Sequence, residues 1–448
     1  MTSNNKELHS KIGLDSNVFY AGLLVLMTIS ILFYFLSIKY PVCCDAKYYV
    51  ELASSLNLNG IDSFNEQVRT FAYPWILSHL LSLSDFFDIQ FSIFVFLFQL
   101  SVYYFSILMV CRALSKYSSK ASNVVYVLLC FNFYVVPYIV IALTESLHIS
   151  LILIFFALVM EIYADVDRSK RDVSKLVFLL FLAFTINMVV RPAAVWLIVP
   201  SMLVVLDMLF RRKVEIAFLA LLILISATPL FIQMSIFGTQ FGKFTIFPIV
   251  DLGGLQIKWG IEFIKYGTWL GGGAPQNYYP STALVNSADS ALGLYWYFEH
   301  PIAAVKLLTV KFVGAFDFDY LTPYAYKRPF IPYISSFIAF AFFWTGLVSI
   351  FVHTCIKRIP ALGRRVMPLL ILISWGAISL SSALELRFTL PLLCYFIVIS
   401  VLFFEFIVPR MNIKYKLIYG VGGVLFISIC FVISDFVRSQ SSVLSYVN

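Results

Sequence analysis

Long runs of apolar residues follow one another along most of the chain, and short polar segments separate them. A run of about 20 apolar residues can cross the roughly 30 Å hydrocarbon core of a bilayer as a helix. The pattern predicts eleven such helices, at residues 18–38, 91–111, 122–140, 147–164, 176–190, 193–210, 216–237, 330–352, 367–383, 389–408 and 417–434. Arg191 and Pro192 divide the fifth and sixth runs, which are also compatible with one interrupted hairpin.

The composition is that of a membrane protein. Hydrophobic residues make up 61% of the 448 residues and charged residues only 12%, whereas about a quarter of a typical soluble protein is charged. The first apolar run exceeds a signal-peptide core, so we expect it to be retained as a span. The net charge of +8 comes mainly from short loops, which indicates membrane topology and not a nucleic-acid surface. The seven cysteines show no metal-ligand or disulfide spacing.

The distribution of Lys and Arg predicts the orientation of the helices. Short cytoplasmic loops are rich in these residues, and a cytoplasmic N-terminus makes every inner segment basic: 1–17, 112–120, 168–175, 211–213, 357–365 and 410–416. We therefore expect residues 1–17 to be cytoplasmic and residues 18–448 to form a single transmembrane domain. Three acids near the inner ends of spans are expected to face cytosolic water: Glu161, Asp207 and Glu405.

Two long segments then lie on the outer side. Residues 39–90 contain two amphipathic stretches, and residues 238–329 are rich in Gly, Tyr and Trp and end with another amphipathic helix. We interpret both as caps with interfacial helices on the outer face of the bundle. The predicted fold class is an all-α polytopic membrane protein.

The first outer segment carries a candidate for chemistry. Asp45 opens a helical pattern that places Tyr48 and Tyr49 on one face and ends near Gly60. The carboxylate suits capping of this helix, and it equally suits taking a proton from an attacking hydroxyl; the two roles are compatible. Arg69 precedes an aromatic, apolar segment, where a guanidinium either snorkels to the interface or binds a phosphate.

Further ionisable residues fall at the outer ends of the predicted spans. Each is compatible with a plain interfacial role as well as with a role in a site, since charges at a membrane boundary must be paired or hydrated. They are Glu145, His148, Arg191, Lys306, Lys311, Glu385 and Arg387. The sequence contains no Gly-Lys-Ser/Thr phosphate loop, so an activated donor would have to be delivered in the membrane itself.

Several segments in order resemble a known class of enzyme: Asp45 with its tyrosines, RTFAYPWIL, TESLHISLIL, RPAAVWLIVP, EHPIAAVKLLTVKF and ELRFTLPLL. Together they resemble integral-membrane glycosyltransferases of the GT-C class. Enzymes of this kind include the bacterial polyprenyl-phosphate-sugar-dependent enzymes related to protein O-mannosyltransferases and lipid A aminoarabinose transferases. The resemblance covers residues 18 to about 408.

The resemblance implies a GT-C-like bundle in a bacterial inner membrane, with a catalytic loop at 39–90 and a substrate-capping loop at 238–329. Such an enzyme moves a sugar from a polyprenyl-phosphate donor to a hydroxyl of a cell-envelope glycan, lipid or protein on the outer face, with inversion. In this sequence Asp45 matches the general base. The donor phosphate is assigned to Arg69, Arg387, Lys306, Lys311 and Arg191, and the sugar or acceptor to Glu145, His148, Tyr48 and Glu385.

The sequence also departs from the pattern of the class. Many relatives have a second acid after the first, where this chain has Ala46. Some relatives use a divalent metal between such acids, so a metal is possible here but not indicated, and no other cofactor is predicted. The alternatives are an O-antigen-type polymerase, a flippase of lipid-linked saccharides and a non-catalytic subunit. A transporter usually carries charges near the midplane and an internal repeat; here the charges lie at the outer ends.

Overall fold

The structure is a computed structural model of the chain. It describes residues 14–38, 44–164, 168–250, 254, 256–257, 260–261, 263–266, 276–277, 294–317, 332–352, 360, 362–382 and 384–439. The chain forms two compact units, which are described separately. The N-terminal unit comprises Met1–Val250 and Thr354–Ile371, and the C-terminal unit comprises Asp251–His353 and Leu372–Asn448.

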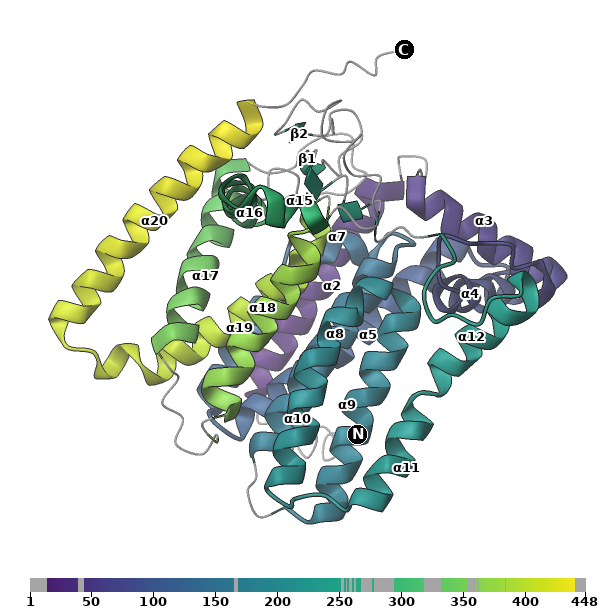
Figure 1. The fold of residues 1–448 in the computed structure, drawn as a ribbon, viewed down its shortest axis with the longest axis horizontal. Coiled ribbons are helices and arrows are strands. Elements are labelled where there is room, and N and C mark those ends of the chain that lie inside the picture. The colour runs from purple at the N-terminus through teal and green to yellow at the C-terminus, as the bar shows by residue number, and fades with distance from the viewer. Residues whose placement is uncertain are drawn as a thin grey trace. The chain divides into compact units, whose positions relative to one another are not determined.

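Helices form the N-terminal unit (Figure 1). α8 packs between α5 and α9, and α3 packs on α4. In the most apolar stretch of α8, 78% of the residues are buried, as expected of a helix that is apolar on every side. The elements are α2 (Ser16–Ile38), α3 (Cys44–Asn59), η1 (Ile61–Ser63), α4 (Ala72–Phe87), α5 (Phe91–Ser115), α6 (Ser119–Cys130), α7 (Val136–Ile139), α8 (Thr144–Ala164), α9 (Lys170–Val190), η2 (Pro192–Leu197), α10 (Ile198–Phe210), α11 (Ile216–Ser226), α12 (Thr228–Phe241) and η3 (Leu362–Val366).

The C-terminal unit combines helices with a small sheet. α17 packs against α19 and α20, and α16 packs against α20 and β1. In the sheet, β1 is antiparallel to β2 and parallel to β3, an addition to the predicted all-α fold. The elements are β1 (Phe263–Tyr266), β2 (Gln276–Asn277), α15 (Leu294–Glu299), α16 (Pro301–Gly314), α17 (Pro332–Val352), β3 (Leu384–Glu385), η4 (Leu386–Phe388), α19 (Leu390–Phe406), η5 (Val408–Arg410) and α20 (Ile413–Ser439). α18 (Met367–Ser379) contains the boundary between the units.

Ten helices among the described residues are long and apolar enough to cross a membrane, so the polytopic class predicted from the sequence is confirmed. They correspond to ten of the eleven predicted spans, and the fifth and sixth runs are separate helices. Residues 1–13 and large parts of the segment 238–329, including 267–275, 278–293 and 318–329, lie outside the described residues.

The predicted span at 122–140 is wrong as a continuous helix. α6 ends at Cys130, and the next helix, α7, is a short turn that begins at Val136. Within the gap the side chain of Asn132 accepts a hydrogen bond from the backbone N–H of Tyr134 (3.2 Å), which competes with helical hydrogen bonding. Pro137 has no N–H to donate to a helix extending from α6. Asn132 is thus a polar residue, and Pro137 a helix-breaking residue, inside an otherwise apolar run.

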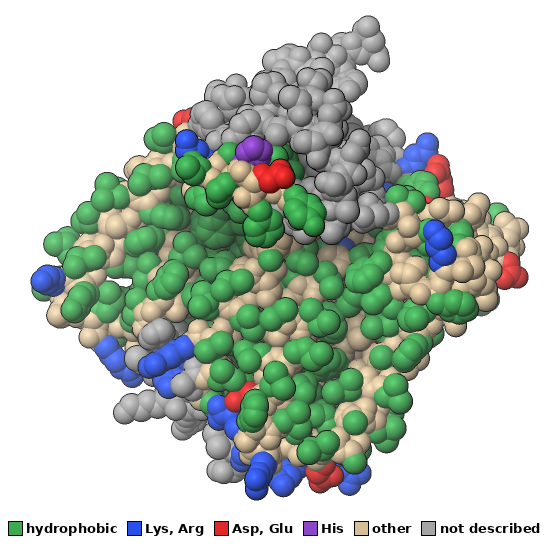
Figure 2. All heavy atoms as spheres, viewed as in Figure 1, with side chains coloured by type: hydrophobic (Ala, Val, Ile, Leu, Met, Phe, Trp, Pro, Cys, Tyr) green, Lys and Arg blue, Asp and Glu red, His purple; other side chains and the backbone are tan. Residues whose placement is uncertain are grey.

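Basic side chains gather at one end of the N-terminal unit. Figure 2 shows a mainly apolar surface over α9, α10 and α11, with basic side chains at the lower end of these helices. Arg211 and Arg212, between α10 and α11, are exposed. The expectation that Glu161 and Asp207 face water is wrong, because each is only 8% exposed. Asp207 pairs with Arg211 (2.8 Å). Glu161 lies among three cations, Arg112, Lys116 and Arg168, supplied by the inner end of α5 and the loop after α8.

Lys311 is fully buried in the C-terminal unit. Its ammonium nitrogen donates to the carbonyls of Leu380 (3.1 Å) and Ser382 (2.8 Å), just beyond the end of α18. Carbonyls at a helix end have no partner within the helix, and a lysine there satisfies them. Burial lowers the pKa of Lys311 to about 7. A neutral amine still has one N–H for each of the two carbonyls, so Lys311 can keep both hydrogen bonds after it loses its proton.

Replacing Lys311 by Met should flatten the pH dependence of stability. The unfolded lysine has its ordinary pKa of 10.5 and the folded one about 7, so between these values the unfolded chain binds more protons. The free energy of unfolding of the wild type therefore rises with pH in this window, by at most about 1.4 kcal/mol per pH unit. The measurement is thermal unfolding in detergent from pH 7 to 10, followed by the fluorescence of the buried Trp375.

The control is Lys306→Met, because Lys306 lies on the same helix and is exposed. That variant should keep the pH slope of the wild type. Equal slopes for the wild type and Lys311→Met would contradict the assignment of a neutral buried lysine.

Candidate functional site

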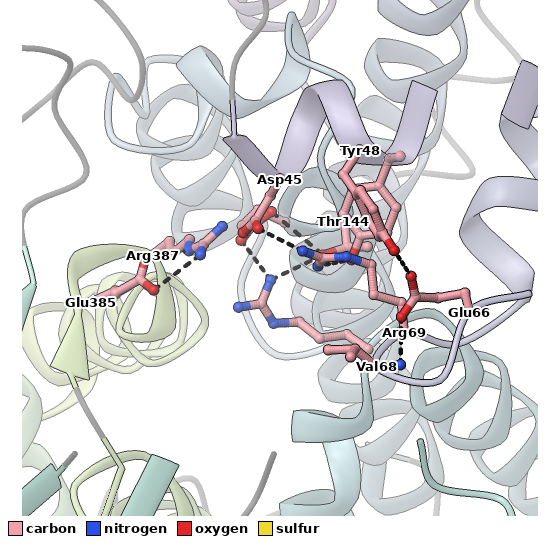
Figure 3. A network of polar contacts seen from close by, with 11 residues as sticks. Asp45, Tyr48, Glu66, Val68, Arg69, Thr144, Glu385 and Arg387 are labelled. Carbon is pink, nitrogen blue, oxygen red and sulfur yellow. Dashed lines mark hydrogen bonds and ion pairs between the residues drawn. The ribbon is translucent and has the colours of Figure 1, made fainter. Parts of the chain in front are cut away.

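Asp45 and Arg69 form a direct ion pair in the N-terminal unit. Asp45 stands in the first turn of α3, and Arg69 lies in the segment between η1 and α4. The Arg69 Nη2 atom donates to Asp45 Oδ1 over 2.7 Å, and the two side chains are 22% and 30% exposed. Figure 3 shows the two side chains pointing toward each other. The pair is thus partly open, and it unites the two residues that the sequence placed at the centre of the site.

Two adjacent tyrosines hold the Arg69 guanidinium. Its Cζ atom lies 5.0 Å from the centre of the Tyr48 ring and 4.8 Å from that of Tyr49, a cation–π arrangement. Nη1 also approaches the Tyr49 hydroxyl (3.4 Å), and the Tyr49 ring packs edge-on against Tyr73. Burial lowers the pKa of Arg69, but Tyr49 and Asp45 more than offset this and raise it overall. The guanidinium therefore stays charged.

Glu66 belongs to the same cluster, and the sequence analysis did not identify it. It is only 2% exposed. Its carboxylate accepts hydrogen bonds from the Tyr48 hydroxyl and from the backbone N–H of Val68 (Figure 3). The hydrogen bond to Glu66, with burial, raises the pKa of Tyr48 to about 12, so the phenol keeps its proton. The only sequence signal was an isolated acid three residues before Arg69.

The segment that follows Arg69 is fastened to other helices. The Thr70 hydroxyl donates to the carbonyl of Val190 at the end of α9 (3.2 Å). The Phe71 N–H donates to the side-chain oxygen of Gln233 on α12 (3.0 Å). Phe71 also belongs to an apolar cluster with Leu56, Phe64, Ile236 and Phe237. Residues on both sides of the arginine are therefore held by packing and hydrogen bonds.

Glu145 and Arg191 form a second, more enclosed pair at the same end of the unit. Glu145 is in the first turn of α8, and Arg191 follows the last residue of α9 in an extended conformation (φ −147°, ψ 109°). Arg191 Nη1 lies 2.6 Å from Glu145 Oε1 and 3.0 Å from the Thr144 hydroxyl. The Glu145 side chain is only 2% exposed. This pair joins α8 to α9.

His148 lies one turn further along α8 and is also buried. Its Nδ1 atom is 2.7 Å from the Asn187 side-chain oxygen, so the imidazole is hydrogen-bonded to α9. The sequence assigned Glu145, His148 and Arg191 to substrate binding. In the structure all three lie at one end of the α8–α9 contact, and their described partners are residues of this chain.

The remaining predicted residues belong to the C-terminal unit. Glu385 and Arg387 form their own two-pronged pair, with Nε to Oε2 at 2.6 Å and Nη2 to Oε1 at 3.0 Å. β3 carries Glu385 and pairs with β1. On α16, Lys306 is exposed whereas Lys311 is buried, so the two lysines do not share one environment.

No group of three or more His, Cys, Asp or Glu side chains among the described residues is arranged to hold a metal ion. Next to Asp45 the chain has the buried Ala46. The polar side chains of the described site are carboxylates, guanidinium groups and phenols.

Removing the Glu145 carboxylate should destabilise the protein. Glu145→Gln would break the largely buried ion pair with Arg191, and removing one partner of such a pair typically costs about 3 kcal/mol or more. The double variant Glu145→Gln/Arg191→Gln should recover part of this loss, because it removes both charges of the pair. The measurement is thermal unfolding in detergent, reported by a dye that reacts with the buried thiols of Cys111 and Cys130.

Asp172→Asn is the control, since Asp172 pairs with Lys175 on the surface (3.4 Å, both more than half exposed), where such pairs contribute little. A Glu145→Gln protein that unfolds at the wild-type temperature would show that the pair does not stabilise the α8–α9 contact.

The chain was also compared with known proteins. No protein-family model matches it, and no curated protein matches it. Among solved structures, the oligosaccharyltransferase of Archaeoglobus fulgidus in its apo form is similar, with 13% identity and a TM-score of 0.46; the match covers 94% of this chain and 56% of that protein. ArnT from Cupriavidus metallidurans bound to undecaprenyl phosphate is also similar, with 11% identity, a TM-score of 0.42 and coverage of 93% and 77%.

The chain spans only 56% of the length of the matched oligosaccharyltransferase. At 13% and 11% identity, the similarity is one of fold alone.

Proposed function

We propose that this protein is a membrane glycosyltransferase that moves a sugar from a polyprenyl-phosphate donor to an acceptor hydroxyl on the outer face of the membrane in which it lies. The observation that carries the proposal is the partly exposed Asp45–Arg69 pair. It places a carboxylate that can accept a proton beside a guanidinium that can bind a phosphate. It lies at the end of the N-terminal unit opposite to the basic inner loops, where a lipid headgroup would be found.

The transfer requires one proton acceptor and one cation. The acceptor oxygen forms a bond to the anomeric carbon as its proton passes to Asp45. The bond between the anomeric carbon and the phosphate oxygen breaks, and the polyprenyl phosphate leaves with the electron pair. Arg69 stabilises the charge that develops on the phosphate. A direct displacement of this kind inverts the anomeric centre.

The Asp45–Arg69 ion pair suggests an order of events. Arg69 Nη2 donates to Asp45 Oδ1, and a guanidinium can bind a phosphate through two of its N–H groups. A donor phosphate would compete with Asp45 for Arg69. A phosphate bound to Arg69 would weaken the Asp45–Arg69 contact, and Asp45 Oδ1 could then accept the proton of the acceptor hydroxyl.

Other predicted residues keep supporting roles in this proposal. Glu145, His148 and Arg191 hold the α8–α9 end next to the Arg69 segment, which Thr70 connects to Val190. In the C-terminal unit, Arg387 with Glu385 and the exposed Lys306 are further candidates for contacts to donor or acceptor. The two carbonyl hydrogen bonds of Lys311 favour a structural role.

Asp45→Asn should reduce sugar transfer by about 10²- to 10⁴-fold, the usual contribution of a general base, while membrane insertion stays normal. The enzyme would be purified in nanodiscs and given a panel of polyprenyl-phosphate sugars, with release of the lipid phosphate measured by mass spectrometry. In parallel, the envelope glycans of a deletion strain complemented with each variant would be analysed.

Asp62→Asn serves as the matched control, because Asp62 is an exposed carboxylate in the same outer segment. Full transfer by an Asp45→Asn protein would exclude Asp45 as the base.

Arg69→Lys should raise KM for the donor roughly tenfold or more with a smaller effect on kcat. A lysine keeps the charge but loses the planar, two-pronged contact and the stacking between two rings. The measurement is steady-state kinetics with varied donor. Arg171→Lys provides the control, because Arg171 also lies over an aromatic ring, that of Phe218, but at the inner end of α9. An unchanged donor KM for Arg69→Lys would remove Arg69 from the phosphate site.

A further inference from the structure

Glu66 is a buried carboxylate that the proposed reaction does not use. Its two oxygens have different partners: the Tyr48 hydroxyl on α3 and the Val68 N–H in its own segment. Burying a carboxylate is costly unless it is hydrogen-bonded, so an acid placed here must contribute something in return. Both of its partners flank Arg69, one through a ring and the other through the chain.

The contacts form a continuous path from Glu66 to the guanidinium. Glu66 fixes the hydroxyl of Tyr48, and the ring of Tyr48 lies 5.0 Å from Arg69 Cζ. Tyr49 lies 4.8 Å from the same atom and is backed by the fully buried Tyr73. Because Tyr48 is 40% exposed, its packing alone does not restrain it, and the hydrogen bond to Glu66 supplies the restraint.

We propose that Glu66 is a positioning residue for the donor-phosphate site. Glu66 keeps Arg69 beside Tyr48 and Tyr49 when the contact between Asp45 and Arg69 breaks. This inference rests on the proposed function. An arginine held only by Asp45 would lose its place at the moment the carboxylate turns to the acceptor. With Glu66 and Tyr48 in place, the guanidinium keeps its orientation while its partner changes from carboxylate to phosphate.

The inference predicts a specific pattern of binding. Undecaprenyl phosphate would be titrated into the full-length protein in nanodiscs, and its dissociation constant measured by microscale thermophoresis. Glu66→Ala and Tyr48→Phe should each weaken binding by roughly tenfold, the usual effect of losing a hydrogen bond to a charged group. The double variant should be no weaker than either single variant, because both changes remove the same hydrogen bond. Glu51→Ala is the control, since Glu51 is an exposed acid on α3, the helix that carries Tyr48.

Kinetics would separate positioning from general stability. Glu66→Ala should raise KM for the donor with kcat nearly unchanged, and Glu66→Gln, which keeps a side-chain oxygen acceptor, should recover part of the loss. Tyr48→Phe retains the ring and does not alter Glu66, so it tests the inference even where Glu66→Ala fails to fold.

Arg69→Ala distinguishes the two levels of the proposal. Weakened binding in Arg69→Ala together with wild-type binding in Tyr48→Phe and Glu66→Ala overturns the role of Glu66 and leaves the phosphate site intact. Wild-type binding in Arg69→Ala overturns the phosphate site itself, and the role of Glu66 with it. Additive losses in the double variant would show that Glu66 and Tyr48 act independently, against the path described here.

Discussion

The distribution of charge is the constraint on which this molecule depends. A helix bundle with this apolar surface can carry ionised groups only where they are paired or reach water, and in the N-terminal unit they are found at the two ends of the helices. Among the paired carboxylates of this unit, three show how exposure differs: the side chain of Glu145 is 2% exposed, that of Glu161 10% and that of Asp45 30%. Pairing of the first two fastens helices together. The third combines pairing with access, which is what a reacting group requires.

The large features of the fold follow from local sequence, because an apolar run of sufficient length has few alternatives to a helix in lipid. α3 illustrates how far this extends: its amphipathic pattern and its end were predictable, and Gly60 follows it with φ 72°, a conformation that glycine adopts readily. The continuous helix predicted at 122–140 was wrong because the length of the apolar run was given more weight than the helix-breaking residues Asn132 and Pro137. Run length also does not say which neighbours surround a residue, so the burial of Glu161 could not be foreseen.

The site was predictable in its charged residues and not in their supports. Asp45 and Arg69 stood out because ionised groups are rare in this chain. Glu66 and Tyr73 act through contacts between segments that have no common periodicity, and no spacing rule relates Glu66 to Tyr48. Lys311 could not be placed from its charge: the sequence assigned it to the donor phosphate, and in the fold it donates to the carbonyls just beyond α18. A residue type indicates possible chemistry, and tertiary packing decides whether the group is free to perform it.

An acid paired with its own cation has a further consequence for the proposed transfer. Before reaction the carboxylate carries one negative charge, the guanidinium one positive charge and a phosphodiester donor one negative charge. Afterwards the carboxyl group is neutral, and the departing lipid phosphate carries the second negative charge. The net charge of the site is unchanged, and a negative charge has moved from one side of Arg69 to the other. A guanidinium fixed between two rings can stabilise both arrangements with little reorganisation, which is the condition under which electrostatic stabilisation is most effective. Holding the arginine still therefore matters as much as supplying it.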